Sequence, residues 1–254
     1  GGPVTNAADL PRPLGFPNCR LCAYKGNGTP ALCAKCAART LRPLAEHHCA
    51  VCGQNLVTPT SNCWNIICGW EPRVRHFTRV DAVALYVTPL EQTIKEYKYG
   101  QKPGSIGWGT IFGRLIVGWL NAHAAEVADI DLIFGNPTAP GRAPLQHIEA
   151  MMKAAHAEDS LGRWPIADPE SPVLIKQYET KKSAGGGVRW GEKIEAAREH
   201  AAALKLRQSV ESKRVLLVDD VFTTGSQFYT VGKFLMETGK AKEVRGLVLA
   251  RVPG

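Results

Sequence analysis

The run from Val215 to Ser226 (VLLVDDVFTTGS) constrains the fold of this chain more than any other stretch. Its first four residues are apolar and predict a short strand buried on both faces, as found in parallel sheets that helices cover on both sides. Asp219 and Asp220 follow, and a Thr-Thr-Gly-Ser turn then opens a helix. The run therefore predicts a strand–loop–helix unit of an α/β fold, with polar residues at the carboxyl end of the strand.

Alternating strand and helix patterns surround this unit from residue 80 onward. Strands are predicted at Val80–Val87, Asp131–Phe134, Val173–Ile175, Val215–Val218 and Val244–Val252, and helices at Pro89–Tyr99, Gly109–Val127, Ala143–Ala157 and Gln227–Thr238. This alternation predicts an α/β domain whose mostly parallel sheet is flanked by helices. In such sheets a ligand lies at the carboxyl ends of the strands.

The loop after the strand has the chemistry of a phosphate site. Backbone N–H groups and hydroxyls at a helix N-terminus form a cradle for a phosphate dianion, and Gly225 allows close approach of the backbone. We therefore expect a branched side chain at Gly225 to fill the cradle. Asp219 and Asp220 are expected at the solvent-facing end of the sheet, where they would accept hydrogen bonds from a pair of ribose hydroxyls.

Three other interpretations of this run compete with a phosphate site. Signalling receiver domains begin with a similar strand, but about a hundred residues follow it there, whereas 34 residues follow Asp220 here. A nucleotide-binding loop of the Walker type needs G-x-x-x-x-G-K-[ST], which the chain lacks. A purely structural strand with a capped helix would not need two adjacent acids at the edge of a sheet.

All eight cysteines fall within fifty residues and form two similar sets. Two Cys-x2-Cys turns can place four thiolates around one Zn²⁺, so structural zinc is predicted. Disulfides and a thioredoxin-type redox pair are the alternatives, and the spacing leaves open whether the sets pair sequentially or crosswise. The predicted zinc ligands are Cys19, Cys22, Cys33 and Cys36 in the first set, and Cys49, Cys52, Cys63 and Cys68 in the second.

The cysteine-rich segment also carries most of the basic excess. The chain has a net charge of +8, and residues 1–76 hold eight Lys or Arg against three acidic residues. With Trp64 and Trp70 nearby, this segment could contact single-stranded nucleic acid through charge and base stacking. A small stabilising or interaction module is the alternative.

The Val215–Ser226 run resembles the signature of type I phosphoribosyltransferases, which bind 5-phosphoribosyl-1-pyrophosphate (PRPP). The chain as a whole resembles the ComF family of competence-associated phosphoribosyltransferase-like proteins. That resemblance rests on the double zinc ribbon, on the closing strand Leu247–Arg251, and on a stretch comprising Tyr86, Leu90, Ile94, Lys98, Tyr99 and Gly100. It implies a PRPP-binding protein that acts in competence and DNA uptake, with single-stranded DNA and a DNA-uptake helicase as partners.

The resemblance also implies roles for individual residues. The 5-phosphate would be bound by Thr223, Thr224, Gly225 and Ser226, with the N–H of Phe222 beside them. Asp219 and Asp220 would hold the ribose hydroxyls and Mg²⁺. The turn Asn136-Pro137-Thr138 would bind pyrophosphate, and Arg142 would replace an arginine that the family carries in a run absent here. A 6-oxopurine acceptor is disfavoured, because Thr223 stands where purine-salvage relatives have an aspartate.

The segment Tyr178–Glu192 lies where a phosphoribosyltransferase has its mobile catalytic loop. It contains three consecutive glycines, and Lys181, Lys182 or Arg189 could reach pyrophosphate oxygens. A surface loop with incidental charges is the alternative. The prediction for the site is therefore either an enzyme that transfers phosphoribose to an unidentified acceptor, or a non-catalytic nucleic-acid handling protein that uses the loop as a phosphate site.

These patterns predict three parts of the chain. Residues 1–18 are predicted to be disordered or left over from cloning, residues 19–76 to form the double zinc ribbon, and residues 77–254 to form the phosphoribosyltransferase-like domain. No stretch reaches the roughly 18 uninterrupted apolar residues of a membrane-spanning helix, and the first ten residues lack the features of a signal peptide. A cytoplasmic protein without membrane insertion is therefore expected.

Overall fold

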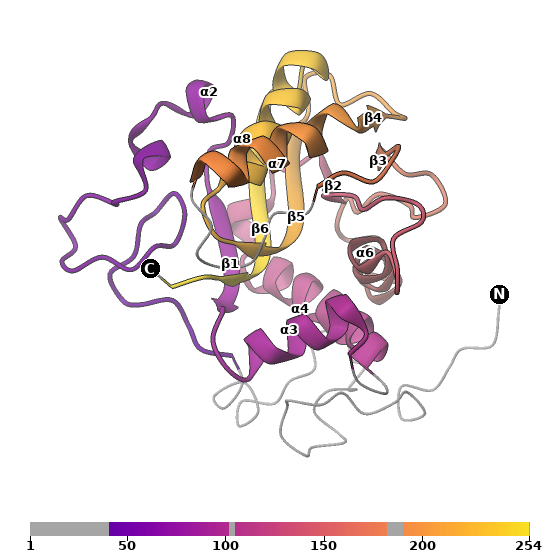
Figure 1. Ribbon diagram of the computed structural model, residues 1–254, viewed down its shortest axis with the longest axis horizontal. Coiled ribbons are helices and arrows are strands. Elements are labelled where there is room, and N and C mark those ends of the chain that lie inside the picture. Colours follow the sequence, from indigo (N-terminus) through magenta and orange to yellow (C-terminus); the bar gives the residue numbers. More distant parts are fainter. Residues whose placement is uncertain (1–40, 102–104, 182–189, 254) are drawn as a thin grey trace.

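A computed structural model describes residues 41–101, 105–181 and 190–253 (Figure 1). Several predictions made above fall outside these ranges. They concern the segment 1–18, the first cysteine set at positions 19, 22, 33 and 36, and two of the predicted loop cations, Lys182 and Arg189.

The sheet consists of four parallel strands in the order β1-β6-β5-β2. They are β1 (Val80–Leu85), β6 (Glu243–Arg251), β5 (Arg214–Phe222) and β2 (Leu132–Gly135). The prediction of a mostly parallel sheet is thereby confirmed. A separate antiparallel pair, β3 (Leu174–Lys176) and β4 (Leu204–Leu206), lies outside this sheet.

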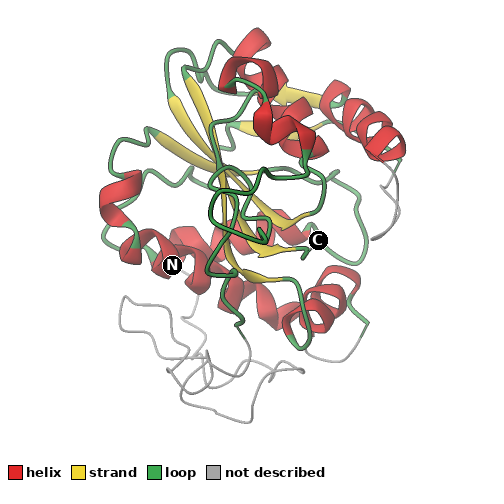
Figure 2. Cartoon of the chain, turned by 90° about the vertical axis from the view of Figure 1, so that its left-hand side faces the viewer, coloured by secondary structure: helices red, strands yellow, loops and turns green. Residues whose placement is uncertain are grey.

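Each strand of the central sheet contributes alternate side chains to two hydrophobic cores. Leu216 and Val218 of β5 belong to one core, whereas Val215 and Leu217 belong to the other. The first core also contains residues of α3 (Leu90–Tyr99), α4 (Trp108–Ala122) and α6 (His147–Glu158). The second contains residues of α8 (Ser226–Lys233) and of the π-helical turn η4 (Phe234–Thr238). Helices therefore flank the sheet on both faces (Figures 1 and 2).

The smaller elements connect these layers. They are η2 (Ile66–Gly69), α2 (Pro72–Arg75), η3 (Ser105–Gly107), α5 (Ala124–Val127) and α7 (Trp190–Ala202), of which α7 packs on α8. Helix α7 was not predicted, and its first turn takes up the end of the segment 178–192 that was assigned to a loop. Within the described ranges, no helix is both long enough and apolar enough to cross a membrane.

The cysteine-rich segment packs directly on the sheet domain. Cys49, Cys52 and Ile67 share the second core with Phe77 and Phe228. Arg75, at the end of this segment, donates hydrogen bonds to the carbonyl oxygens of Trp70, Phe77 and Thr78. Residues on both sides of the predicted boundary at 76/77 therefore belong to one core.

Candidate functional site

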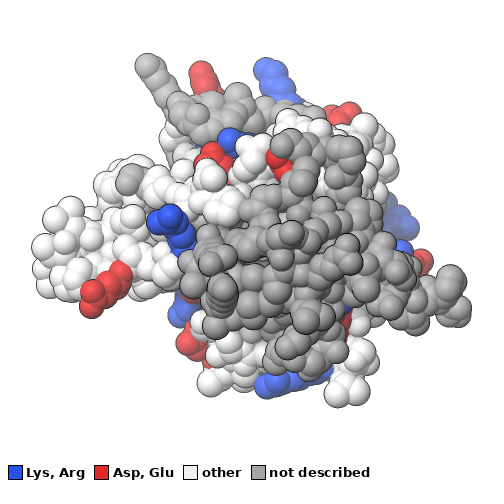
Figure 3. Space-filling model, turned by 90° about the horizontal axis from the view of Figure 1, so that it is seen from below, with Lys and Arg blue, Asp and Glu red and all other residues white. Residues whose placement is uncertain are grey.

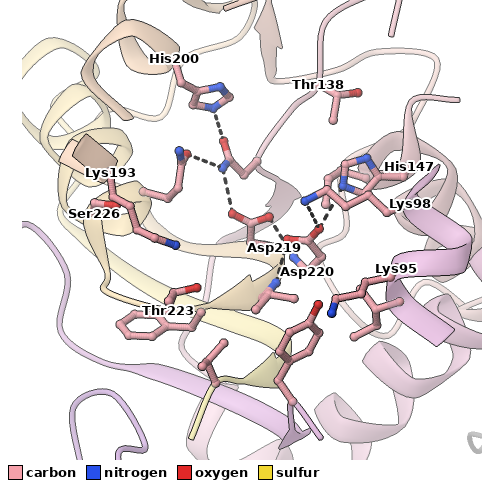
Figure 4. Close-up of a pocket in the computed structure, with 18 of the residues that line it drawn as sticks. Lys95, Lys98, Thr138, His147, Lys193, His200, Asp219, Asp220, Thr223 and Ser226 are labelled. Atoms are coloured by element: carbon pink, nitrogen blue, oxygen red, sulfur yellow. Dashed lines mark hydrogen bonds and ion pairs between the residues drawn. The ribbon is translucent and has the colours of Figure 1, made fainter. Parts of the chain in front are cut away.

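A cavity of about 810 Å³ lies at the carboxyl ends of the parallel strands. It is lined by all the residues predicted for the PRPP site that the structure describes, namely Asn136, Pro137, Thr138, Arg142, Lys181, Asp219, Asp220, Phe222, Thr223, Thr224, Gly225 and Ser226. Lysines and histidines that the sequence did not assign to a site also line it, namely Lys95, Lys98, His147, Lys193 and His200 (Figure 4), together with Lys176. The predicted residues thus line one cavity, to which α3, α7 and β3 add lysines.

Asp220 forms an ion pair at the centre of this cavity. Its Oδ2 atom lies 3.2 Å from Lys98 Nζ and 3.1 Å from His147 Nε2 (Figure 4). Helix α3 supplies the lysine, and α6 supplies the histidine, whose carbonyl oxygen accepts a hydrogen bond from Tyr97. Burial opposes ionisation of Asp220, but Lys98 and His147 hold its pKa well below the usual range. Asp220 is therefore a carboxylate with a built-in counter-ion.

Asp219 has a neutral partner instead. Its Oδ2 accepts a hydrogen bond from Asn136 Nδ2 at 2.9 Å, and the Oδ1 of this asparagine lies 2.6 Å from His200 Nε2. Burial, together with the adjacent charge of Asp220, raises the pKa of Asp219 well above its usual range. Burial also lowers the pKa of His200 to about 3, so its ring is neutral at physiological pH. The pKa values of the two adjacent acids are therefore shifted in opposite directions.

Burial of the two acids corrects the prediction that they face solvent. Each residue is only 8% exposed, and β5 continues through them to Phe222 instead of ending at Val218. The strand is longer than predicted because each acid is satisfied within the fold, Asp219 by Asn136 and Asp220 by Lys98 and His147. These acids therefore contribute to the structure as well as to the cavity.

The loop from Thr223 to Ser226, which was predicted to form a phosphate cradle, leads into the start of α8. Gly225 has φ of +87°, a conformation that residues with a Cβ rarely adopt. In the described part of the chain, no acceptor is present for the backbone amides of Thr223, Thr224 and Gly225, whereas the amide of Ser226 lies 3.3 Å from Thr224 Oγ1. Three consecutive amides at the wall of the cavity are thus available to an anion.

The structure corrects the reason given for a glycine at position 225. A Cβ atom added there would lie 2.7 Å from Ile67 Cδ1 and 2.8 Å from Phe222 Cζ, which are atoms of the second core. A side chain would therefore collide with the cysteine-rich segment and would not fill the cradle.

The turn predicted to bind pyrophosphate has its donors engaged within the chain. The backbone N–H of Thr138 lies 2.9 Å from Glu149 Oε1, and its hydroxyl lies 2.7 Å from the same oxygen. Arg142 donates from Nη1 to the carbonyl oxygen of Leu145 and from Nη2 to that of Lys98. Glu149, whose pKa is raised by burial, therefore occupies the position of an anionic ligand at this turn.

The second cysteine set forms a compact cluster. The Sγ atoms of Cys49, Cys52, Cys63 and Cys68 all lie within 4.8 Å of one another, and none of these residues is in a disulfide. Zinc–sulfur bonds of about 2.3 Å in a tetrahedron place sulfurs about 3.8 Å apart. The Sγ atoms of Cys52 and Cys63 are 3.8 Å apart. The cluster fits a tetrahedral metal ion, and its four sulfurs all come from the second set.

Four neighbouring thiols cannot all ionise without a cation among them. Hydrogen bonds from Cys52 and Cys68 lower the pKa of Cys49. Burial, followed by the proximity of the other sulfurs, raises the pKa of Cys63 to about 12, and the hydrogen bond to Cys49 raises that of Cys68. A divalent ion would remove this conflict by compensating the four thiolate charges.

Comparisons with known proteins do not identify the chain. No protein-family model matches it, and no curated protein matches it either.

Proposed function

We propose that the chain is a PRPP-binding, phosphoribosyltransferase-like protein that acts in DNA uptake. The observation that carries this proposal is the convergence of two features in one cavity. The available amides of residues 223–225 face the same space as Asp219 and Asp220, at the carboxyl ends of parallel strands. A phosphate cradle beside two acids suits a sugar phosphate better than it suits free phosphate.

In this proposal, the 5-phosphate binds at the cradle and the ribose hydroxyls bind at the two acids. All four carboxylate oxygens of Asp219 and Asp220 accept hydrogen bonds within the chain, but each has a second lone pair. Because Lys98 already neutralises Asp220, Mg²⁺ would enter with the pyrophosphate group. The lysines around the cavity, among them Lys95 and Lys193, would compensate the remaining negative charge.

We also assign the cysteine cluster to structural Zn²⁺. Four sulfur ligands at tetrahedral spacing favour Zn²⁺ over hard cations such as Mg²⁺, which prefer oxygen. The ion would stabilise a segment in whose described part the helices are two single turns, η2 and α2.

Calorimetry with three ligands tests the assignment of the site. PRPP with Mg²⁺, ribose 5-phosphate and pyrophosphate are titrated separately into the protein. We expect ribose 5-phosphate and PRPP to bind and pyrophosphate alone to bind weakly, because the cradle and the acids recognise the sugar phosphate. Absence of heat with both sugar phosphates would show that the assignment is wrong.

A second candidate is a non-catalytic protein that handles single-stranded DNA and holds a nucleotide phosphate in the cradle. The internal contacts of Thr138 with Glu149 and of Arg142 with backbone carbonyls favour it, since they engage donors that pyrophosphate would need. Among the described residues of the face in Figure 3, basic and acidic side chains are interspersed. Trp64, which is 70% exposed, is the aromatic side chain best placed to stack on a base.

Two measurements separate these candidates. An enzyme releases pyrophosphate from PRPP in the presence of one member of a panel of acceptors, whereas the non-catalytic protein does not. In the second case, PRPP binds no more tightly than ribose 5-phosphate. Affinity for single-stranded DNA should then fall steeply with salt and should drop in Trp64→Ala.

A further inference from the structure

The cysteine cluster and the phosphate cradle are in direct contact through two buried side chains. Arg251 is 2% exposed and donates from Nε to the carbonyl oxygen of Cys52 at 2.7 Å. Its Nη2 donates to Gln54 Oε1 at 2.8 Å and lies 3.5 Å from Cys52 Sγ. The same guanidinium stacks over the Phe222 ring, 4.5 Å from its centroid, and Nη1 lies 3.2 Å from the carbonyl oxygen of Thr223.

Asn65 makes the second connection. It lies between Cys63 and Cys68 and is 8% exposed, and its Nδ2 donates to the carbonyl oxygen of Thr224 at 2.9 Å. Ile67, two residues further along, fills the space behind Gly225. The segment between the two last cysteine ligands is therefore packed against the loop itself.

These contacts orient three consecutive peptide groups. The carbonyl oxygens of Phe222, Thr223 and Thr224 are held by Arg251 and Asn65 on the side of the cysteine cluster. The peptide bonds here are trans, and in a trans peptide group the N–H points away from the preceding C=O. The amides that follow these carbonyls, at positions 223–225, therefore point away from the cluster, and residues 223–225 line the cavity.

We infer that metal binding at the cysteine cluster and anion binding at the cradle are thermodynamically coupled, with Arg251 and Asn65 as positioning residues. The identity of the anion rests on the proposed function, whereas the orientation of the loop does not depend on it. Metal in the cluster fixes Asn65, which holds the Thr224 carbonyl, and the Cys52 carbonyl, which holds Arg251, so the amides are arranged before the anion arrives. Coupling is reciprocal, so the bound anion must strengthen metal binding by the same factor.

The first arm of the test needs no anion. Hydrogen–deuterium exchange is measured on the full chain with Zn²⁺ bound and after its removal by a chelator with a thiol reductant present. We expect exchange of the Tyr229 and Val252 amides, which donate to the loop carbonyls of Gly225 and Phe222, to rise about tenfold on metal removal, within the usual range of coupling, while strand β2 stays unchanged. In the zinc-bound protein, Asn65→Ala should raise exchange of the Tyr229 amide about threefold or more, the effect of one lost hydrogen bond to the loop.

Ser61→Ala is the matched control for Asn65→Ala. Ser61 lies in the same cysteine set, but its hydroxyl bonds only Thr58 within its own turn, as far as the described residues show. We expect this variant to leave exchange of the Tyr229 and Val252 amides unchanged. Equal effects of the two variants would overturn the role of Asn65, and equal increases in β2 and the loop on metal removal would overturn the specific coupling.

The second arm measures Zn²⁺ affinity by competition with a chelating dye, with and without saturating ribose 5-phosphate. We expect the sugar phosphate to tighten Zn²⁺ binding about tenfold in the wild type and less in Asn65→Ala. Unchanged Zn²⁺ affinity in the presence of a sugar phosphate that binds would overturn the coupling. If no sugar phosphate binds, the proposed function fails, and the exchange arm still decides whether the cluster orients the loop.

Discussion

Replacement of Gly225 by alanine measures how tightly the cradle is packed against the cysteine-rich segment. The substitution has two separate costs. A residue with a Cβ at φ of +87° costs about 1–2 kcal/mol, the usual penalty of the left-handed region. The added atom would lie 2.7 Å from Ile67 Cδ1, and overpacking of this kind costs about 1–3 kcal/mol. We therefore expect Gly225→Ala to lower the free energy of unfolding by about 2–5 kcal/mol.

Gly162 provides the matched control. It also has a positive φ, of +64°, but an added Cβ would meet no atom within 4 Å. Gly162→Ala should therefore show the backbone penalty alone, about 1–2 kcal/mol. The difference between the two variants isolates the contact with the cysteine-rich segment.

Urea unfolding of these variants, followed by circular dichroism, is the assay. A third substitution, Ile67→Val, removes the colliding Cδ1 atom, so the double variant should be less destabilised than the sum of the two single changes by about 1 kcal/mol. If Gly225→Ala is no more destabilising than Gly162→Ala, or if the two changes at 67 and 225 are additive, the packing argument is wrong.

Four further predictions concern the metal, the acids and the turn at Thr138. The purified protein should contain zinc, two ions per chain if both cysteine sets close, and Cys49→Ser should remove one ion by elemental analysis; disulfides found by thiol titration in zinc-free protein would contradict this. Asp220→Asn should destabilise the fold by about 1–3 kcal/mol because it leaves Lys98 without its counter-ion, and Asp220→Asn combined with Lys98→Met should recover part of that loss in urea unfolding. The pKa of His200 is lowered to about 3. As pH falls below about 6.5, the unfolded chain therefore binds a proton that the folded chain does not. The free energy of unfolding should then fall about 1.4 kcal/mol per pH unit more steeply in the wild type than in His200→Gln. Glu149→Gln should increase affinity for pyrophosphate in calorimetry, since it removes the negative charge that accepts the hydrogen bond from the amide of Thr138. Unchanged affinity would show that this turn is not an anion site.

The sequence predicted the central sheet well because its strands follow local rules. The apolar run at Val215–Val218 is buried in consecutive residues, and the strand that begins at Val80 is rich in apolar residues, so no tertiary information is needed to find them. Helix α7 was missed because most of its residues are alanine or charged, so no apolar face stands out in the sequence. The three glycines just before it also favour a loop. Weak amphipathicity left no signal in that segment.

The partners of the two acids were not predictable in the same way. His147 and His200 lie on helices 73 residues before Asp220 and 64 residues after Asn136, and nothing in their neighbourhood marks them. Lys98 belongs to a stretch noted for its resemblance to a family, but that stretch alone gives it no role. Which cysteines cluster together was also open, because three Cys-x2-Cys turns and one Cys-x4-Cys turn carry no information about pairing.

The bond between Cys52 and Arg251 joins residues that are 199 positions apart. A chain synthesised at about 5–20 residues per second needs about 10–40 s to add that many residues. During this interval the cysteine cluster exists without the strand that lies against it, since β6 is the last strand to be made. Contacts of such long range form late in folding. The four cysteines of this cluster are therefore made early, but their surroundings are complete only when β6 pairs with β5, so a metal ion bound before that point would be held by an exposed peptide.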